Sequence, residues 1–324
     1  MGIRVESPGL LTTVQDAGRF GEYDIGMPPS GAMDLFSYEV GNYLVGNDPG
    51  AAGLEITYLG PRLQFTAPAV IAITGADMPP RINGEEAAVW ETLSVEEGDV
   101  LSFDYLKDGA RSYLAVAGGI DVPEFLGSRS TYTLIGLGGH EGRALQEGDE
   151  LRVGAAADGA PRVGSAVARE HVPAYDASDE IRVIVGMCSY RLTENSLKGF
   201  LRTEWTVTPD ANRTGYRMRG GELEFVEREQ PAGAGSDPAN VVDLGYPVGS
   251  IQIPGGVEPI VLMNDAVTGG GYATIGTVIS VDRDRLAQTK TNDPVRFRSV
   301  TLDEALEARR ERQQRLRAIR EALR

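Results

Sequence analysis

Three polar, glycine-rich segments contain most of the side chains that could bind or transform a small molecule. They run from residue 13 to 34, from 210 to 218 and from 249 to 272. They supply arginines, side-chain amides, a hydroxyl group and aspartates, in settings where glycine lets backbone amides approach a ligand closely. This combination suits hydrogen bonding to a planar molecule that carries an amide or a carboxylate. It does not suit a metal centre or phosphate chemistry.

The first segment offers Gln15, Asp16, Arg19 and Ser30 as substrate-binding candidates. Arg19 could bind a carboxylate through two parallel hydrogen bonds, with Asp16 holding its orientation. Alternatively, Asp16 and Arg19 form an internal ion pair that fixes the N-terminal segment. Ser30 sits between two prolines and a glycine, a rigid setting that could present its hydroxyl to a substrate. We favour the other interpretation, in which Ser30 caps the next helix and Asp34 adds charge to its first turn.

The other two segments contain our predicted catalytic residues, Arg213, Gln252 and Asp265. Asn212, Arg213 and Arg217 could donate hydrogen bonds to an amide or ureido oxygen on which negative charge develops. A structural arginine in a β-turn is the alternative. Gln252 offers an amide that both donates and accepts.

Asp265 and Thr268 precede a run of glycines that begins at Gly269. We predict Asp265 as a base or as an acid that orients the substrate; an Asx turn at a strand end is the alternative. Asn212, Arg217, Thr268 and Gly269 are predicted to bind the substrate, together with the candidates of the first segment.

Several chemistries are excluded by missing motifs. The chain has no glycine-rich loop that ends in Gly-Lys-Ser or Gly-Lys-Thr, so it contains no P-loop for ATP. Only His140 and His171 occur, which argues against a histidine metal cage or a Ser-His-Asp triad. Cys188 ends an apolar strand pattern and is interpreted as a buried structural thiol. We predict no metal.

Charge and hydropathy limit the partners. The formal net charge of −16 argues against nucleic acid and anionic membranes, because phosphate groups would be repelled. No apolar stretch is long enough to span a bilayer, and the first residues do not form a secretory leader. We therefore expect a cytoplasmic protein with a small-molecule substrate.

The hydrophobic pattern predicts a mainly β protein. Short apolar runs at residues 69–73, 112–116 and 181–185 are of strand length and are bounded by turn-forming residues. Helical spacing occurs only from Ala32 to Val45 and from Leu302 to Leu323, where the second helix is expected to dock weakly or to fray. We predict an N-terminal β domain (1–154), a linker (155–179), a second β domain (180–300) and a C-terminal helix (301–324). Residues 230–240 are expected to form a mobile loop.

Several longer motifs resemble the allophanate hydrolase subunit 2 (Kip-type) family. They are the run from Thr13 to Gly21, Pro-Pro-Ser-Gly-Ala-Met-Asp at 28–34, the strand and turn at 111–120, and the short motifs at 126–131, 212–215 and 252–254. The resemblance extends in order from about Ile3 to Phe297. It implies two β-barrel-like domains, at least one of them cyclophilin-like, as in the carboxyltransferase domain of urea carboxylase.

The resemblance also implies partners and an activity. Many stand-alone bacterial members are the C-type component of 5-oxoprolinase, which works with a Kip-inhibitor-like B component and a LamB/YcsF-type A component. The complete enzyme opens 5-oxoproline to glutamate and uses ATP, and this chain alone is expected to be inactive and to bind no cofactor. One alternative is a carboxyltransferase subunit that uses carboxybiotin; another is a non-catalytic regulator that binds a Kip-inhibitor-like protein. Asp243–Val248 departs from the Ser-Asp-Gly-type turn expected before Gly249, which weakens any transfer of substrate contacts.

Overall fold

The computed structural model describes residues 2–157, 161–175, 180–186 and 188–324. The chain divides into two compact units. Unit 1 contains the residues up to Arg19, Ser30–Tyr175 and Gln313–Arg324, and unit 2 contains Phe20–Pro29 and Asp176–Arg312. Residues 20–29, which we had placed in the N-terminal domain, therefore belong with the second unit.

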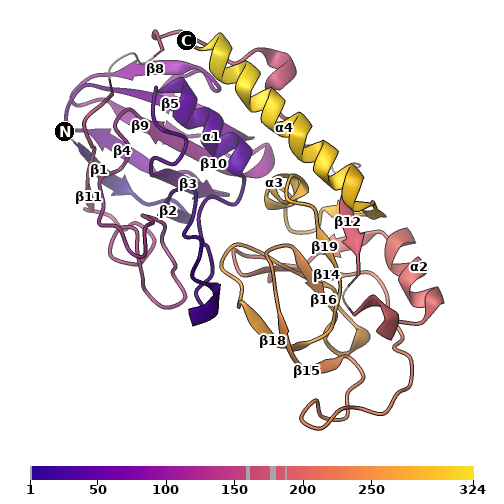
Figure 1. The fold of residues 1–324 in the computed structure, drawn as a ribbon. Coiled ribbons are helices and arrows are strands. Elements are labelled where there is room, and N and C mark those ends of the chain that lie inside the picture. Colours follow the sequence, from indigo (N-terminus) through magenta and orange to yellow (C-terminus); the bar gives the residue numbers. More distant parts are fainter. Residues whose placement is uncertain (1, 158–160, 176–179, 187) are drawn as a thin grey trace. The chain divides into compact units, whose positions relative to one another are not determined.

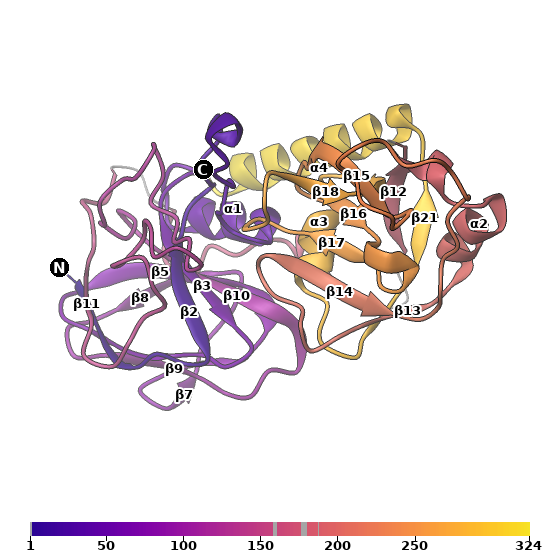
Figure 2. The same cartoon turned by 90° about the horizontal axis from the view of Figure 1, so that it is seen from below.

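Unit 1 contains two antiparallel sheets (Figures 1 and 2). One has the strand order β11 (Glu150–Arg152), β1 (Gly2–Ser7), β4 (Arg62–Phe65), β9 (Val100–Phe103), β6 (Pro80–Ile82) and β7 (Glu85–Glu86). The other has the order β2 (Leu11–Gln15), β3 (Gly53–Thr57), β10 (Asp108–Val116), β5 (Ala69–Asp77) and β8 (Thr92–Val95). Alternate residues of both sheets, among them Val5, Leu54, Leu63 and Leu114, form one apolar core.

The opposite face of the second sheet is polar and still buried. Thr13 on β2 and Tyr113 on β10 both pair with Glu55 on β3, and Arg111 pairs with Thr57. All five side chains are buried. Burial raises the pKa of Tyr113, and the negative charge of Glu55 raises it further, so the phenol stays protonated and donates to Glu55 over 2.9 Å.

The segment before helix α1 (Leu35–Leu44) crosses this polar face. Ala32 N donates to Asp16 O over 2.9 Å, Met33 N to Glu55 Oε2 over 2.8 Å, and Asp34 N to Tyr113 Oη over 2.8 Å. The helix begins three residues later than predicted because these backbone donors have tertiary partners. Asp34 is the N-cap and accepts from Ser37 N. The predicted cap at Ser30 is thus wrong.

The C-terminal helix α4 (Leu302–Ala322) is present as predicted, but its last turns are docked, not frayed. Ile319 is 2% exposed and joins Leu323, Phe36 and Val40 of α1 in an apolar cluster of unit 1. The Arg315 guanidinium also lies 4.5 Å from the centre of the Phe36 ring. Apolar contacts on one face and cations over aromatic rings explain why an arginine-rich helix packs there.

The described parts of the predicted linker are packed against unit 1. Ala166 forms a bridge with Glu91, Val167 is buried, and a short 3₁₀ helix, η2 (Arg169–His171), follows. Residues 158–160 and 176–179 of the predicted linker lie outside the described residues.

Unit 2 is built on a larger sheet (Figure 2). Its order is β20 (Pro294–Val295), β13 (Trp205–Val207), β14 (Gly215–Arg219), β17 (Ile260–Leu262), β16 (Ser250–Gln252), β19 (Thr274–Val278), β12 (Ile181–Val185) and β21 (Phe297–Ser299). Strands β12 and β21 pair in parallel, and the other neighbours are antiparallel. Helix α2 (Glu194–Arg202) packs beside β21, where Phe200 stacks on Phe297 at 4.8 Å.

Smaller elements complete unit 2. They are the ribbon of β15 (Asn240–Gly245) and β18 (Gly269–Tyr272), helix α3 (Asp282–Ala287), and the 3₁₀ helices η1 (Tyr23–Ile25), η3 (Ser189–Arg191) and η4 (Pro254–Gly256). Cys188 is buried, as predicted. Residues 230–239 form neither helix nor strand, and Arg191 donates to Pro238 O at their end. The prediction of a mainly β chain with a C-terminal helix is confirmed. Among the described residues, no helix combines the length and apolarity needed to cross a membrane.

Replacing the cap of α1 should weaken unit 1. The Asp34 carboxylate accepts from Ser37 N over 3.0 Å and from Ser37 Oγ over 2.6 Å, so Asp34→Ala should lower the free energy of unfolding by about 1–2 kcal/mol. Urea denaturation measures the change. The control is Asp303→Ala in the exposed first turn of α4, for which a change below about 0.5 kcal/mol is expected. Equal effects of the two variants would contradict the assignment.

Acid should weaken the turn before β11. Asp149 accepts from both terminal nitrogens of Arg143, which lowers the pKa of its carboxyl to about 2. A depressed folded-state pKa stabilises the protein above the unfolded-state value, about 4, and this contribution is lost as the pH falls to about 2. Asp149→Asn should therefore flatten the acid limb of the unfolding free energy against pH. If the unfolding free energy of Asp149→Asn falls with acid as steeply as that of the wild type, other carboxylates determine the loss of stability.

Candidate functional site

A pocket of about 630 Å³ lies on one face of three adjacent strands in unit 2. Strand β14 pairs with β17, and β17 pairs with β16, which brings Arg217, Ile260 and Gln252 side by side. The loop before β14 closes one wall. The lining residues are Asp210, Asn212, Thr214, Gly215, Arg217, Gln252, Glu258, Ile260, Leu262 and Val267. The pocket therefore includes three of the residues that we predicted from the sequence, Asn212, Arg217 and Gln252.

The pocket combines one cation (Arg217), two carboxylates (Asp210 and Glu258), two amides and an apolar patch. Arg217 pairs with Glu258 over 2.9 Å, and both side chains are partly exposed. Asn212 uses its oxygen in an Asx turn, accepting from Thr214 N over 2.8 Å, so its amide nitrogen takes no part in that turn. Ile260, Leu262 and Val267 supply apolar contacts. Such a lining suits a small planar molecule with a carboxylate or an amide.

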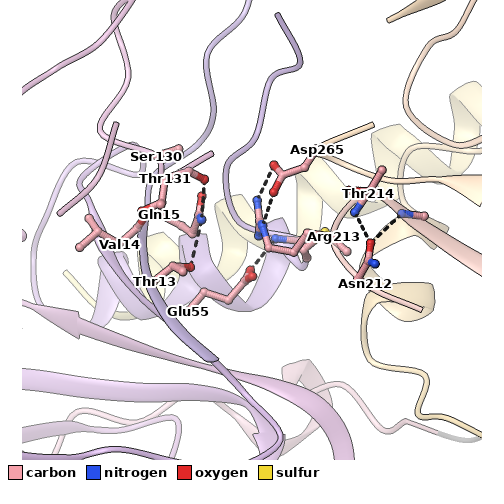
Figure 3. Close-up of polar contacts among 12 residues, drawn as sticks. Thr13, Val14, Gln15, Glu55, Ser130, Thr131, Asn212, Arg213, Thr214 and Asp265 are labelled. Carbon is pink, nitrogen blue, oxygen red and sulfur yellow. Dashed lines mark hydrogen bonds and ion pairs between the residues drawn. The ribbon is translucent and has the colours of Figure 1, made fainter. Parts of the chain in front are cut away.

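Arg213 and Asp265 form a buried ion pair (Figure 3). Neither residue lines the pocket. Arg213 Nε and Nη2 donate to the two oxygens of Asp265 over 2.8 and 3.1 Å, and the residues are only 5% and 2% exposed. Asp265 N also donates to Arg213 O over 2.9 Å. The pair therefore fixes the loop that carries Asn212. To act as a base, Asp265 would have to release its ion pair with Arg213 and contact a substrate group instead.

Gln252 is 6% exposed and is supported by Tyr246, which the sequence analysis did not single out as a candidate. The phenol donates to Tyr272 O over 2.8 Å and accepts from Tyr272 N over 2.7 Å. Burial raises the pKa of Tyr246, while hydrogen bonds from Tyr272 N and from the Gln252 side chain lower it. Tyr246 thus joins the pocket to the β15–β18 ribbon.

Thr268 and Gly269 lie in or beside that ribbon. Thr268 O accepts from Tyr246 N over 2.8 Å, and Gly269 pairs with Gly245. At Gly270 a Cβ atom would lie 3.0 Å from the Tyr246 ring, so the glycine run makes room for this side chain. The contacts of Thr268 and Gly269 are structural, and neither residue lines the pocket.

In unit 1, Asp16 and Arg19 bind the loop at residues 125–130. The Asp16 carboxylate accepts from Ser128 Oγ over 2.7 Å and from Gly18 N over 2.8 Å. Arg19 is buried, donates to Ser130 O over 2.8 Å and lies over the Phe125 ring. These contacts explain how the first motif and the 126–131 motif are held together. The substrate-binding role of Asp16 and Arg19 stays a prediction.

Gln15 and Ser30 are buried at the end of β2. The Gln15 amide nitrogen donates to Thr13 Oγ1 over 3.0 Å and to Thr131 O over 3.1 Å (Figure 3). Ser30 has a left-handed backbone with φ of 51°. In the part of the chain that the structure describes, no group of three or more His, Cys, Asp or Glu residues could hold a metal ion.

Comparison with protein families matches residues 25–299 to the model described as "Carboxyltransferase domain, subdomain A and B". The chain belongs to this family. It is also 36% identical to the C component of 5-oxoprolinase from Escherichia coli over 314 residues, which is 96% of this chain and 95% of that protein. With the corresponding 5-oxoprolinase component of Haemophilus influenzae it shares 33% identity, over 92% of this chain and 91% of that one.

The urea-utilising relatives are much longer. The chain is 35% identical to the urea amidolyase of Lachancea kluyveri over 90% of its own length but only 16% of that protein. The Kluyveromyces lactis urea carboxylase structure matches 98% of this chain and 29% of that one, with a TM-score of 0.92 and 32% identity. The predicted family resemblance is thereby confirmed, including the relation to urea carboxylase.

Three residues that pair with or position the candidate side chains were not predicted from the sequence. Glu258 and Tyr246 occupy turn-rich stretches with no recognised motif. Glu55 could have been found, because a lone carboxylate within the otherwise uncharged strand Gly53–Thr57 indicates a buried partner.

Removing one member of the buried ion pair should destabilise unit 2. Asp265→Ala leaves the Arg213 guanidinium buried without its carboxylate, so the free energy of unfolding should fall by about 3–5 kcal/mol. The double variant Arg213→Met/Asp265→Leu should recover most of the loss, because no buried charge remains. Urea denaturation of both variants measures this. A stable Asp265→Ala variant would contradict a structural role for the pair.

Proposed function

We propose that the chain is one component of a 5-oxoprolinase-type amidohydrolase that converts 5-oxoproline to glutamate and uses ATP. The strongest support is that the match extends over nearly the whole of both proteins. It covers 96% of this chain and 95% of the E. coli 5-oxoprolinase component. Against urea amidolyase, the chain corresponds to only 16% of the relative. In this proposal the chain works in the cytoplasm with a Kip-inhibitor-like B component and a LamB/YcsF-type A component, and it is inactive alone.

The pocket of unit 2 is the proposed substrate site. Arg217 would bind the carboxylate of 5-oxoproline, since its present partner, Glu258, is partly exposed and can be displaced. Gln252 and the amide nitrogen of Asn212 would hydrogen-bond to the lactam. Ile260 and Leu262 would contact the methylene carbons of the ring.

Hydrolysis adds the hydroxyl of water to the lactam carbon, breaks the C–N bond and transfers the remaining proton of water to the nitrogen, which becomes an amine. Negative charge develops on the carbonyl oxygen, and amide donors held by the fold stabilise that charge without reorganisation. In this mechanism Tyr246 and the Arg213–Asp265 pair position the donors. ATP would be supplied and bound by the complex, because this chain has no P-loop.

Carboxyl transfer is the second candidate function. It is favoured by the close structural match to urea carboxylase, with a TM-score of 0.92 over 98% of this chain. The same donors would polarise the ureido oxygen of carboxybiotin, and positioning of the acceptor nitrogen would carry most of the catalysis.

Glutamate release from 5-oxoproline and ATP tests the proposal. The chain is co-purified with its Kip-inhibitor-like and LamB/YcsF-type partners, and glutamate is expected only from the complete set. Gln252→Ala should lower kcat by about 100-fold because one charge-stabilising donor is lost. The matched control is Gln314→Ala on the exposed part of α4, which should retain full activity. No glutamate from an assembled complex would reject the proposal, and carboxybiotin-dependent transfer would then be assayed.

A further inference from the structure

The pocket of unit 2 contains one more acid than its cation neutralises. Asp210 and Glu258 both line it, and Arg217 is the only cation among the described residues of the lining. Arg217 Nη1 donates to Glu258 Oε2 over 2.9 Å, so this ion pair contributes no net charge. The carboxylate of Asp210 is left over. A concave site concentrates the field of such a charge, which favours a ligand with a cationic group.

The turn that contains Asp210 does not use its carboxylate. Ala211 N donates to Thr208 O over 3.2 Å, and the side-chain acceptor of the turn is Asn212 Oδ1, which accepts from Thr214 N over 2.8 Å. Within the described part of the chain, no hydrogen bond or ion pair reaches the Asp210 carboxylate. Aspartates in turns often accept from the backbone two residues on, but here Asn212 has that role. The fold therefore does not require an acid at position 210.

Strand pairing places Asp210 and Arg217 on one wall of the pocket. Thr208 N donates to Arg217 O over 2.9 Å, and Asp210 follows two residues after Thr208. On β14, the neighbours Tyr216 and Met218 are buried, so the side chain of Arg217 lies on the opposite face of the strand, which lines the pocket. The unused acid and the cation are therefore neighbours.

Arg217 and Asn212 retain donors for a carboxylate. Arg217 Nη1 bonds to Glu258, whereas Nε and Nη2 donate to no described residue. The amide nitrogen of Asn212 takes no part in the Asx turn. A guanidinium group and an amide N–H on the same wall can donate together to one carboxylate. The hairpin thus offers an acceptor for an ammonium group beside donors for a carboxylate.

The surface beside Arg217 is apolar. Ile260 pairs with Arg217 across the β14–β17 ladder, so the two side chains lie on the same face. Leu262 pairs with Gly215 in the same way. Gly215 keeps this surface open, because a Cβ atom there would lie 3.0 Å from Ile260 Cγ2. With Val267, which is 52% exposed, Ile260 and Leu262 form an apolar patch that fits an aliphatic side chain.

We infer that this pocket binds a zwitterionic α-amino acid with an aliphatic side chain. Asp210 accepts from the ammonium group, Arg217 and Asn212 donate to the carboxylate, and the apolar patch contacts the side chain. The volume of about 630 Å³ is in the range of small-molecule sites. The binding does not depend on the proposed reaction. If that reaction occurs, such amino acids compete with 5-oxoproline, which has no ammonium group to pair with Asp210.

The test is binding of L-leucine to the full chain, measured by ligand-observed NMR titration. Two analogues each lack one charged group of leucine: 4-methylpentanoate has no ammonium group, and 3-methylbutylamine has no carboxylate. Each analogue should bind about tenfold more weakly than leucine, because hydrogen bonds to one charged group are lost.

Asp210→Asn should weaken the binding of leucine about tenfold. The same variant should bind 4-methylpentanoate as tightly as the wild type or more tightly, because that ligand has no ammonium group and is repelled by the carboxylate. Its melting temperature should equal that of the wild type, since position 210 is exposed. The matched control is Asp243→Asn, an exposed aspartate of β15 outside the pocket lining, which should bind leucine like the wild type.

Three results would overturn the inference: no binding of leucine by the wild type, binding of either analogue as tightly as leucine, or wild-type affinity of Asp210→Asn for leucine. Equal weakening by Asp210→Asn and Asp243→Asn would show a general effect of net charge and would also reject the contact. Glutamate formation is not measured, so failure of this inference and failure of the proposed function are distinguishable.

Discussion

The buried carboxylate of Glu55 determines how the segment at residues 30–34 of unit 1 is placed. A carboxylate withdrawn from water must be hydrogen-bonded, and Glu55 accepts from Met33 N and Tyr113 Oη. Those two bonds determine where the segment at residues 30–34 crosses the sheet. The crossing point in turn determines where α1 begins and where Ser30 lies. A sheet face that would be solvated in many antiparallel proteins is here covered by a segment with few side-chain atoms.

Unit 2 uses a buried ion pair for a similar purpose. Arg213 and Asp265 connect two loops that are 52 residues apart in the sequence, and one of these loops carries Asn212. A buried pair of this kind contributes little net stability, but losing one partner is costly. Both units therefore hold their polar candidate residues with charged groups that are themselves inaccessible. This arrangement keeps the donors rigid, which is what stabilisation of a developing charge requires.

The proposed substrate and the lining of the unit 2 pocket are chemically compatible. 5-Oxoproline contains a lactam, and the urea-utilising relatives act in a chemistry of N–C=O groups. Side-chain amides and arginines are suited to such groups. The same polar inventory can serve hydrolysis or carboxyl transfer.

The sequence by itself determined the fold class, the C-terminal helix, the family and three pocket residues. Strand periodicity and turn chemistry are local properties, and β5, β10 and β12 coincide with or contain the predicted apolar runs. Asn212, Arg217 and Gln252 were found because polar side chains in glycine-rich segments can be recognised in the sequence alone. Only the tertiary structure decided that Asp34 caps α1, that Asp265 is paired with Arg213, and that residues 20–29 belong with unit 2. Each of these depends on contacts between distant residues, and a carboxylate's partner is set by which strands and loops become neighbours when the chain folds.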